Sequence, residues 1–193
     1  MKMRTTPTHI YFWHGPLSNW SKPSHFIGAD AFRELMTLLA PLGIAHPRPD
    51  DPISHLLCCH RYNCGEQWMM AVKAWFFGDV PRLRAILEAW EPKDQKAIGR
   101  DVTPFSAEEW NTICVPAVTA GTLARAEANP ALCKLLLDSG DRQFVEGSPV
   151  DRIWGVGLRY DDPRIDDQRN WRGRNLLGTS HALTRTILRS RGR

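Results

Sequence analysis

The sequence predicts a predominantly helical α+β fold with a few short strands. Amphipathic segments bounded by helix start and stop signals recur along the chain, whereas only short apolar runs resemble strands. The 193 residues are 42% hydrophobic and include eight tryptophans, so the chain can build one sizeable core. With no internal repeat, we expect a single domain over residues 1–193, with an insertion at about 30–63.

The first predicted strand covers residues 9–13 and is closed by His14-Gly15-Pro16, after which a polar loop follows. Asp30 can cap an amphipathic helix that reaches Leu39. The stretch from Pro41 to Pro52 contains four prolines, which predicts a loop or an inserted excursion.

The central buried helix is predicted to begin at Gly65, because large apolar residues recur at helical spacing until Gly78-Asp79 stops them. A second helix is expected over Pro81–Trp90, with Pro81 in its first turn. A short helix over Pro92–Ile98 should end at a break formed by Gly99-Arg100-Asp101.

Ser106 and Glu109 form a capping box, so a long helix should start there and run towards Ala128, with a kink at Pro116. Asn129-Pro130 should start another helix that ends after Leu137. The remaining expectations are a strand over Gln143–Glu146, an extended or partly turned segment over Ile153–Leu158, and a final helix over Ser180–Leu188.

Composition also restricts the location and the partners. No signal peptide or membrane-spanning run is recognisable, and the five cysteines lack the spacing of a disulfide framework. We therefore expect an intracellular protein, cytoplasmic or nuclear, that does not bind membranes. The net charge of +4 permits a polyanionic partner, although the arginines at the C-terminus are also typical of a solvated helix end.

Glu66 and Lys73 stand out as candidate catalytic residues. Seven positions apart on one helix, they project from nearly the same face, roughly 10 Å apart along the axis. On an ordinary surface helix they would be a first-turn carboxylate and a solvated cation. This helix is apolar on nearly all sides, however, so both groups must be paired or functional, and burial should bring each pKa towards neutrality.

A set of motifs, in order along nearly the whole chain, resembles the NADAR superfamily. The motifs are Phe12 to Trp20, Glu66 to Ala71 with Lys73-Ala74, Phe77-Gly78-Asp79, Gly99-Arg100, Trp110, Val145-Glu146, Ser148-Pro149 with Asp151, Trp154-Gly155 to Leu158, and Asn175 to Gly178. The main departure is the long stretch from Asp30 to Asn63.

The resemblance implies an N-glycosidase that acts on ribose-containing compounds. Two substrate classes belong to such proteins: guanine in nucleic acid that carries ADP-ribose, and phosphoribosylamino-pyrimidine intermediates of riboflavin synthesis. Both join the ribose to the base through an exocyclic amine, and such a glycosylamine can open its sugar ring to an imine. The basic charge favours the nucleic acid substrate.

Two mechanisms remain open. In the first, a neutral Lys73 attacks the anomeric carbon to form a Schiff base while Glu66 transfers protons and activates water. In the second, Glu66 or Asp151 activates water against an oxocarbenium-like sugar without a covalent step.

The matched positions suggest a binding site for a ribose phosphate. Serine and asparagine can bind sugar hydroxyls, arginine can bind phosphate, and tryptophan can stack on a base. Each also has an ordinary structural role, as a turn former, a surface ion pair or a core residue. The predicted substrate-binding residues are Ser18, Asn19, Trp20, Arg100, Trp110, Trp154, Gly155 and Asn175.

Residues 55–64 contain enough cysteine and histidine to raise the question of zinc, but their spacing matches no metal-binding template. We therefore expect no metal and no cofactor. The primary hypothesis is removal of ADP-ribose from guanine in DNA or RNA. The alternatives are cleavage of the riboflavin intermediates and a noncatalytic module that binds ADP-ribose or NAD. The oligomeric state is not predicted.

Overall fold

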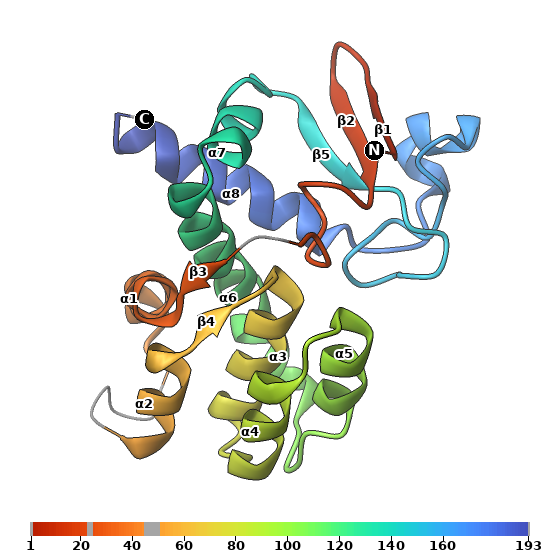
Figure 1. The fold of residues 1–193 in the computed structure, drawn as a ribbon. Coiled ribbons are helices and arrows are strands. Elements are labelled where there is room, and N and C mark those ends of the chain that lie inside the picture. The colour runs from red at the N-terminus through yellow and green to blue at the C-terminus, as the bar shows by residue number, and fades with distance from the viewer. Residues whose placement is uncertain (1, 23–24, 45–50, 193) are drawn as a thin grey trace. The chain divides into compact units, whose positions relative to one another are not determined.

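The computed structural model describes residues 2–22, 25–44 and 51–192 and confirms the predominantly helical α+β fold class (Figure 1). The chain forms two compact units. We call residues 1–21 with 130–193 the end unit and residues 22–129 the middle unit. Within the described ranges, no helix combines the length and the apolar character needed to span a membrane.

The end unit is built on a three-stranded sheet in the order β1-β2-β5. β1 (Lys2–Thr5) is antiparallel to β2 (His9–Trp13), whereas β5 (Gln143–Glu146) is parallel to β2. Because parallel neighbours need a crossover connection, the whole middle unit lies in the chain between β2 and β5. The predicted strands at 9–13 and 143–146 are confirmed, and β1 is an addition.

The helices of the end unit follow in the last third of the chain. α8 packs against β5 and against α7, beside the sheet (Figure 1). α8 begins four residues before the predicted Ser180, and the segment 153–158 is irregular. The elements are α7 (Pro130–Leu137), the short 3₁₀ helices η2 (Pro163–Asp166) and η3 (Gln168–Asn170), and α8 (Leu176–Ser190).

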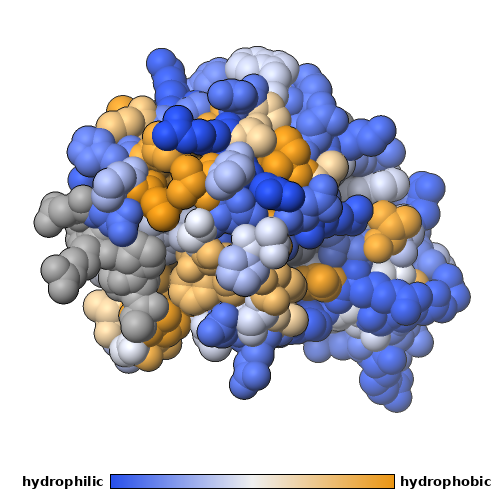
Figure 2. All heavy atoms as spheres, turned by 90° about the horizontal axis from the view of Figure 1, so that it is seen from below, coloured by the Kyte–Doolittle hydropathy of each residue, from blue (hydrophilic) through white to orange (hydrophobic). Residues whose placement is uncertain are grey.

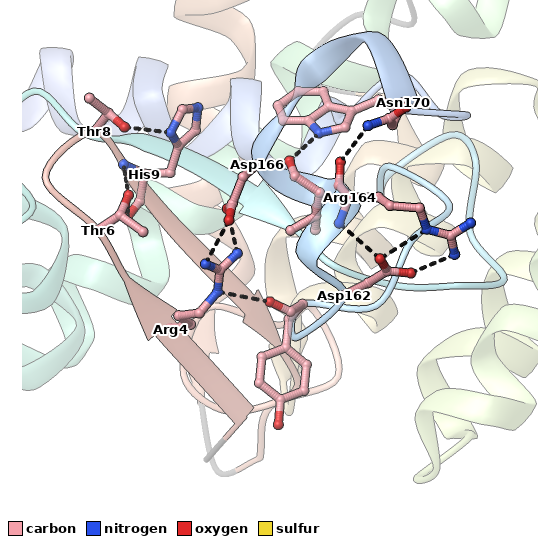
Figure 3. A network of polar contacts seen from close by, with 11 residues as sticks. Arg4, Thr6, Thr8, His9, Asp162, Arg164, Asp166 and Asn170 are labelled. Carbon is pink, nitrogen blue, oxygen red and sulfur yellow. Dashed lines mark hydrogen bonds and ion pairs between the residues drawn. The ribbon is translucent and has the colours of Figure 1, made fainter.

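A network of polar contacts fixes the segment 160–171 against β1 (Figure 3). Arg4 donates to both carboxylate oxygens of Asp166, at 3.1 and 2.6 Å, and to the carbonyl oxygen of Tyr160 at 3.3 Å. This ion pair lowers the pKa of Asp166. Tyr11 and Ile165 belong to a buried core cluster of this unit, and burial raises the pKa of Tyr11 to about 12.

The middle unit is almost entirely helical. α6 packs against α1 and α3, and α3 also packs against α4 and α5. β3 and β4 form a separate antiparallel pair. The elements are β3 (Phe26–Ile27), α1 (Gly28–Leu39), the 3₁₀ helix η1 (Ala40–Leu42), α2 (Pro52–Cys59), β4 (Arg61–Tyr62), α3 (Gly65–Phe76), α4 (Val80–Glu88), α5 (Pro92–Arg100) and α6 (Ala107–Ala128).

α3 is the buried helix that the sequence predicts. All residues from Gly65 to Trp75 are buried. Its two tryptophans satisfy their indole N–H groups inside the core: Trp68 donates to the carbonyl oxygen of Ala117 at 2.8 Å, and Trp75 donates to Ser54 Oγ at 2.9 Å. These bonds fix the orientation of α3 between its neighbours.

The start of α1 and the end of α5 differ from the sequence prediction. Asp30 lies inside the first turn of α1, because the helix already begins at Gly28. A Cβ atom on Gly28 would lie 2.2 Å from the carbonyl oxygen of Leu57, so the helix start is set by close packing against α2. α5 continues through Gly99 to Arg100, and the predicted break comes only at Asp101.

The start and end of the long α6 are as predicted: Ser106 Oγ caps the helix by accepting a hydrogen bond from the backbone N–H of Glu109 at 3.2 Å, and the helix continues through Pro116 to Ala128. Of the predicted loop over 41–52, residues 45–50 lie outside the described residues. The flanking parts of the expected insertion are ordered as α1, η1, α2 and β4.

Some large apolar side chains remain exposed. The face drawn in Figure 2 carries hydrophobic patches between hydrophilic ones. In the middle unit the exposed side chains include Trp90 and Phe105, and in the end unit they include Val150 and Ile153.

The contact between α3 and α6 supplies a stability test. A Cβ atom on Gly121 would lie 2.3 Å from Trp68 Cδ1. Helix propensity alone would make Gly121→Ala stabilising by about 1 kcal/mol, but overpacking against a fixed ring costs about 1–3 kcal/mol. We expect a net loss in the free energy of unfolding, measured by urea denaturation.

The Trp68→Phe background provides the control for this test. A smaller ring relieves the overlap, so Gly121→Ala should be less destabilising there, by at least about 0.5 kcal/mol of coupling energy. Equal effects in both backgrounds would show that the Trp68 contact does not determine the outcome.

Candidate active site

The two predicted catalytic residues of the middle unit lie on α3, and both are buried despite their charge. Glu66 is in the first turn and 3% exposed, and Lys73 is near the last turn and 8% exposed. Because the surrounding faces of α3 pack against α4, α5 and α6, neither side chain has an ordinary solvated position. Such burial of ionisable groups is typical of functional sites.

Lys73 is held by a carbonyl oxygen and an aromatic ring. Its Nζ donates to the carbonyl oxygen of Gly99 at 2.7 Å and lies 4.0 Å from the centre of the Phe105 ring. Burial lowers the pKa of Lys73, and the nearby carboxylate of Asp101 opposes this shift. The neutral amine is therefore accessible at lower pH than in an exposed lysine, which is what a nucleophilic amine requires.

Gly99 brings this carbonyl group close to Lys73. A Cβ atom at Gly99 would lie 2.0 Å from Met70 Sδ, so glycine lets α5 approach α3 without displacing the Met70 side chain. Arg100 follows as the exposed last residue of α5, where its side chain is open to solvent. The sequence prediction placed a helix break at Gly99 and Arg100. In the structure these two residues form the last part of α5, which packs closely against α3.

Phe105 is a functional candidate that the sequence analysis missed. Its side chain is 47% exposed, and its ring contacts both the Lys73 amine and the ring of Phe77, whose centre lies 5.3 Å away. It stands in an irregular segment without periodicity, so no sequence pattern indicated its position. The half-exposed ring therefore lies between the Lys73 amine and solvent-accessible surface.

The sequence analysis also missed Arg125 on α6, whose guanidinium acts electrostatically near the Glu66 end of α3. Burial is the largest influence on the pKa of Cys64, which is raised; the Glu66 carboxylate acts in the same direction and Arg125 opposes it. Both charges therefore act on one buried thiol beside the start of α3. Arg125 is 1% exposed, and burial lowers its pKa to about 10.

Buried amides hold the start of α3 in place. Gln67 Oε1 accepts from the backbone N–H of Asn63 at 3.0 Å, and its Nε2 donates to carbonyl oxygens of residues 86, 87 and 89. Gln95 Oε1 accepts from Cys64 Sγ at 3.1 Å, and its Nε2 donates to the carbonyl oxygen of Ala89. These bonds preorganise the turn that carries Glu66.

In the end unit, the loop after β2 carries Ser18, Asn19 and Trp20. Ser18 Oγ accepts from the backbone N–H of Trp20 at 3.1 Å, and Ser18 and Asn19 are 7% and 5% exposed. Trp20 is 39% exposed. His181 of α8, which the sequence analysis did not single out, donates from Nε2 to the carbonyl oxygen of Leu17 at 2.7 Å and fixes this loop.

Asn175 and Gly155 shape the backbone of the end unit. Asn175 adopts a left-handed conformation (φ +56°); its Oδ1 accepts from the N–H of Glu146 at 3.0 Å, and its Nδ2 donates to the carbonyl oxygen of Phe144 at 2.8 Å. A Cβ atom on Gly155 would lie 2.8 Å from the carbonyl oxygen of Glu146. Both residues thus fit the chain tightly around the end of β5.

Asp151 organises the loop that contains Trp154. Its Oδ1 accepts from the backbone N–H groups of Ile153 at 2.9 Å and Trp154 at 2.8 Å, and its own N–H donates to Ser148 Oγ at 3.2 Å. This carboxylate has a clear role as a turn former. Trp154 of this loop is half-buried, and so is Trp110, in the first turns of α6 in the middle unit.

The described residues contain no group of three or more histidine, cysteine or acidic side chains placed to hold a metal ion. His55 Nδ1 and Cys59 Sγ lie 3.5 Å apart on α2. All five cysteines are free thiols.

Comparison with known proteins identifies the family. The model described as the NADAR domain matches residues 11–189, and the chain therefore belongs to the NADAR family. This match extends over both units. The NMR structure of the E. coli protein YbiA has a similar fold, with a TM-score of 0.60, 18% identity, and coverage of 100% of this chain and 91% of YbiA.

Curated relatives share part of the sequence. N-glycosidase R617 of Acanthamoeba polyphaga mimivirus is 38% identical over 117 residues, which are 61% of this chain and 69% of that protein. Protein irg-1 of Caenorhabditis elegans is 33% identical over 120 residues, 61% of this chain and 57% of that protein. An N-glycosidase of Nostoc punctiforme is 28% identical over 79 residues, 41% of this chain and 51% of that protein.

Lys73→Met tests whether the buried amine stabilises the folded state. The pKa of Lys73 in the folded state lies below its ordinary value of 10.5. At a pH between the folded-state pKa and 10.5, the unfolded chain binds more protons than the folded chain, so the free energy of unfolding rises with pH in this range. At pH 7 burial of the ammonium opposes folding. Met has a similar shape without the charge, so the free energy of unfolding should change by no more than about 1 kcal/mol.

The measurement is urea unfolding of parent and variant at pH 7 and at pH 10. The parent should gain stability relative to Lys73→Met at the higher pH. A loss of about 3 kcal/mol or more at pH 7 would instead assign Lys73 to a stabilising buried ion pair.

Proposed function

We propose that this protein is an N-glycosidase that hydrolyses the bond between ribose C1 and an exocyclic amine of a base, and that its substrate is guanine in nucleic acid modified with ADP-ribose. Membership of the NADAR family and the two relatives named N-glycosidases support a glycosidase-type hydrolase. The observation that carries the proposal is the buried Lys73 amine with its lowered pKa on the same helix as Glu66.

The chemistry follows from the substrate bond. A sugar joined through an exocyclic amine opens to an imine, in which C1 is electrophilic. The neutral Lys73 amine attacks C1, the amine of the base leaves with a proton, and a Schiff base joins C1 to Nζ. Water then adds to C1 and Lys73 departs, so that one water is consumed and the free sugar and the unmodified base are released.

Glu66 is the proposed acid and base in these steps. A carboxylic acid can protonate the departing base amine, and the resulting carboxylate can accept a proton from the incoming water. The amide network around Gln67 and Gln95 restrains the helix turn that carries Glu66, which favours a fixed geometry for proton transfer. Glu66 also shares α3 with the proposed nucleophile, so one rigid element presents both groups.

The noncovalent alternative uses a carboxylate to activate water directly. Of the two candidates for that role, Asp151 already accepts two backbone N–H bonds as a turn former, whereas Glu66 shares a buried helix with Lys73. Glu66 is therefore the carboxylate that we propose for either mechanism.

The nucleic acid substrate is supported by charge. The net charge of +4 favours a polyanion, and Arg100 is an exposed cation in the residue next to Gly99, whose carbonyl oxygen binds Lys73. A riboflavin intermediate with a single phosphate and a noncatalytic ADP-ribose module are the alternatives that the following experiment separates.

The first activity test measures release of ADP-ribose from a guanine-ADP-ribosylated oligonucleotide. Glu66→Gln keeps the shape of the side chain but cannot transfer the proton, and Lys73→Met removes the nucleophile. We expect each variant to lower kcat at least about 100-fold while remaining folded by circular dichroism.

Thr37→Ala, an exposed change on α1, is the matched control and should retain parental activity. If the parent releases no sugar from the oligonucleotide but cleaves a phosphoribosylamino-pyrimidine, the substrate assignment is wrong and the reaction class stands. If it binds ADP-ribose and cleaves neither, the noncatalytic module replaces the enzyme.

The second test separates the two mechanisms. Sodium borohydride added during turnover should reduce the Schiff base and leave a stable sugar adduct, located by peptide mass spectrometry on Lys73.

Asp151→Asn keeps an oxygen that can accept the N–H bonds of the loop, so we expect less than about a tenfold loss in kcat.

Efficient cleavage with no adduct on Lys73 would support direct attack by water. A loss of 100-fold or more for a folded Asp151→Asn protein would transfer the role of base from Glu66 to Asp151.

A further inference from the structure

We propose that the surface around Arg152 and Arg172 in the end unit is a docking surface for single-stranded nucleic acid. This inference rests on the proposed function, because it supplies the contacts that distinguish a nucleic acid substrate from a small molecule. Arg152 and Arg172, with Val150 and Ile153, were not assigned to binding by the sequence motifs, although they adjoin the predicted site residues Asp151, Trp154 and Gly155.

The two arginines are held side by side by the backbone. The N–H of Arg172 donates to the carbonyl oxygen of Val156 at 2.8 Å, and the N–H of Arg174 donates to the carbonyl oxygen of Arg152 at 3.0 Å. The position of a Cβ atom on Gly157 lies 3.0 Å from Arg172 Cβ and 3.4 Å from Arg152 Cγ. Both side chains therefore flank the same point of the loop.

Gly173 allows this close pairing of the two segments. A Cβ atom there would lie 2.2 Å from the carbonyl oxygen of Gly155 and 2.8 Å from Arg152 Cα. The Asp151 turn, with its two backbone N–H bonds, adds a second restraint directly before Arg152. The arginines are thus carried by a backbone that is already ordered before any ligand binds, which lowers the entropic cost of binding.

The charge of these arginines is not neutralised as it is in their neighbours. Arg4 pairs with Asp166 and Arg164 pairs with Asp162 (Figure 3). Across the described ranges, neither Arg152 nor Arg172 forms an ion pair, although both are exposed.

The acidic groups of this region are already engaged. Asp151 accepts backbone N–H bonds, and the pKa of Asp162 is lowered to about 2 mainly by its hydrogen bond with Arg164, with a smaller contribution from Arg172. The surface therefore presents two cations to an external anion.

Apolar side chains next to the arginines indicate which polyanion fits. Val150 is 87% exposed and Ile153 is 55% exposed, one on each side of the Asp151-Arg152 pair. A single strand offers phosphates to the cations and unstacked base faces to the apolar groups, whereas the bases of a duplex are stacked and covered. A small phosphate ligand has no apolar group that could contact Val150 and Ile153.

The test measures binding of a fluorescein-labelled, unmodified single strand of about 12 nucleotides by anisotropy, between about 50 and 300 mM salt. For Arg152→Gln with Arg172→Gln in the full chain, we expect about a tenfold or greater loss in affinity at low salt. The slope of log K against log salt should fall by about 1.4, because each lost phosphate contact removes about 0.7.

Arg189→Gln is the matched control. It removes one positive charge from an exposed arginine at the far end of α8, paired there with Asp141, and should leave the slope unchanged. Val150→Ser with Ile153→Ser should weaken binding about threefold or more with the slope unaltered, because these side chains contact bases and not phosphates. Equal affinity and slope for the parent and the double arginine variant would overturn the proposal.

Cleavage assays keep this outcome apart from that of the proposed function. On ADP-ribosylated guanosine as a free nucleoside, the arginine variants should match the parent, whereas on the modified oligonucleotide their KM should rise with kcat retained. A parent that cleaves the oligonucleotide with no dependence on Arg152 and Arg172 refutes the docking surface alone. A parent that cleaves nothing, but binds the strand through these arginines, refutes the proposed reaction alone.

Discussion

Burial of α3 on every side constrains the rest of the middle unit, because a helix without a solvent face must satisfy each polar group that it carries. The indole N–H groups of Trp68 and Trp75 find acceptors on α6 and α2, and the amide of Gln67 binds backbone carbonyls near the end of α4. Close approach of the neighbouring helices requires glycine, at Gly121 on α6 and Gly99 on α5. The packing that surrounds α3 therefore also determines where its ionisable side chains can point.

The same burial connects stability with chemistry. A lysine in this position raises the free energy of the folded state at neutral pH, and the contacts with the Gly99 carbonyl and the Phe105 ring offset only part of that cost. Sequences that needed only a stable core would place an apolar side chain there. The buried amine has a lowered pKa, which is what the proposed nucleophile requires, and buried amides hold the turn that carries Glu66.

Local patterns predicted much of the fold, and they failed where tertiary contacts decide. The periodicity from Gly65 and the Ser106 cap are properties of the neighbouring residues, so α3 and α6 were recognised. The start of α1 at Gly28 depends on contact with the backbone of α2, and β1 is a polar edge strand without an apolar alternation. Phe105, Arg125 and His181 act through residues far away in the chain, and no spacing rule connects them to their partners.

Two polar residues that the family motifs singled out in the end unit, Asn175 and Asp151, are engaged in local structure. Asn175 and Asp151 use their side chains on the backbone of β5 and of the loop 151–154. These contacts restrain the backbone that carries the half-buried Trp154 and the exposed arginine beside it. A preordered loop binds with a smaller loss of conformational entropy, so under the proposed function these two residues are positioning residues that act through the loop. Replacing them is then expected to weaken binding by loosening the loop, without removing a contact to the substrate.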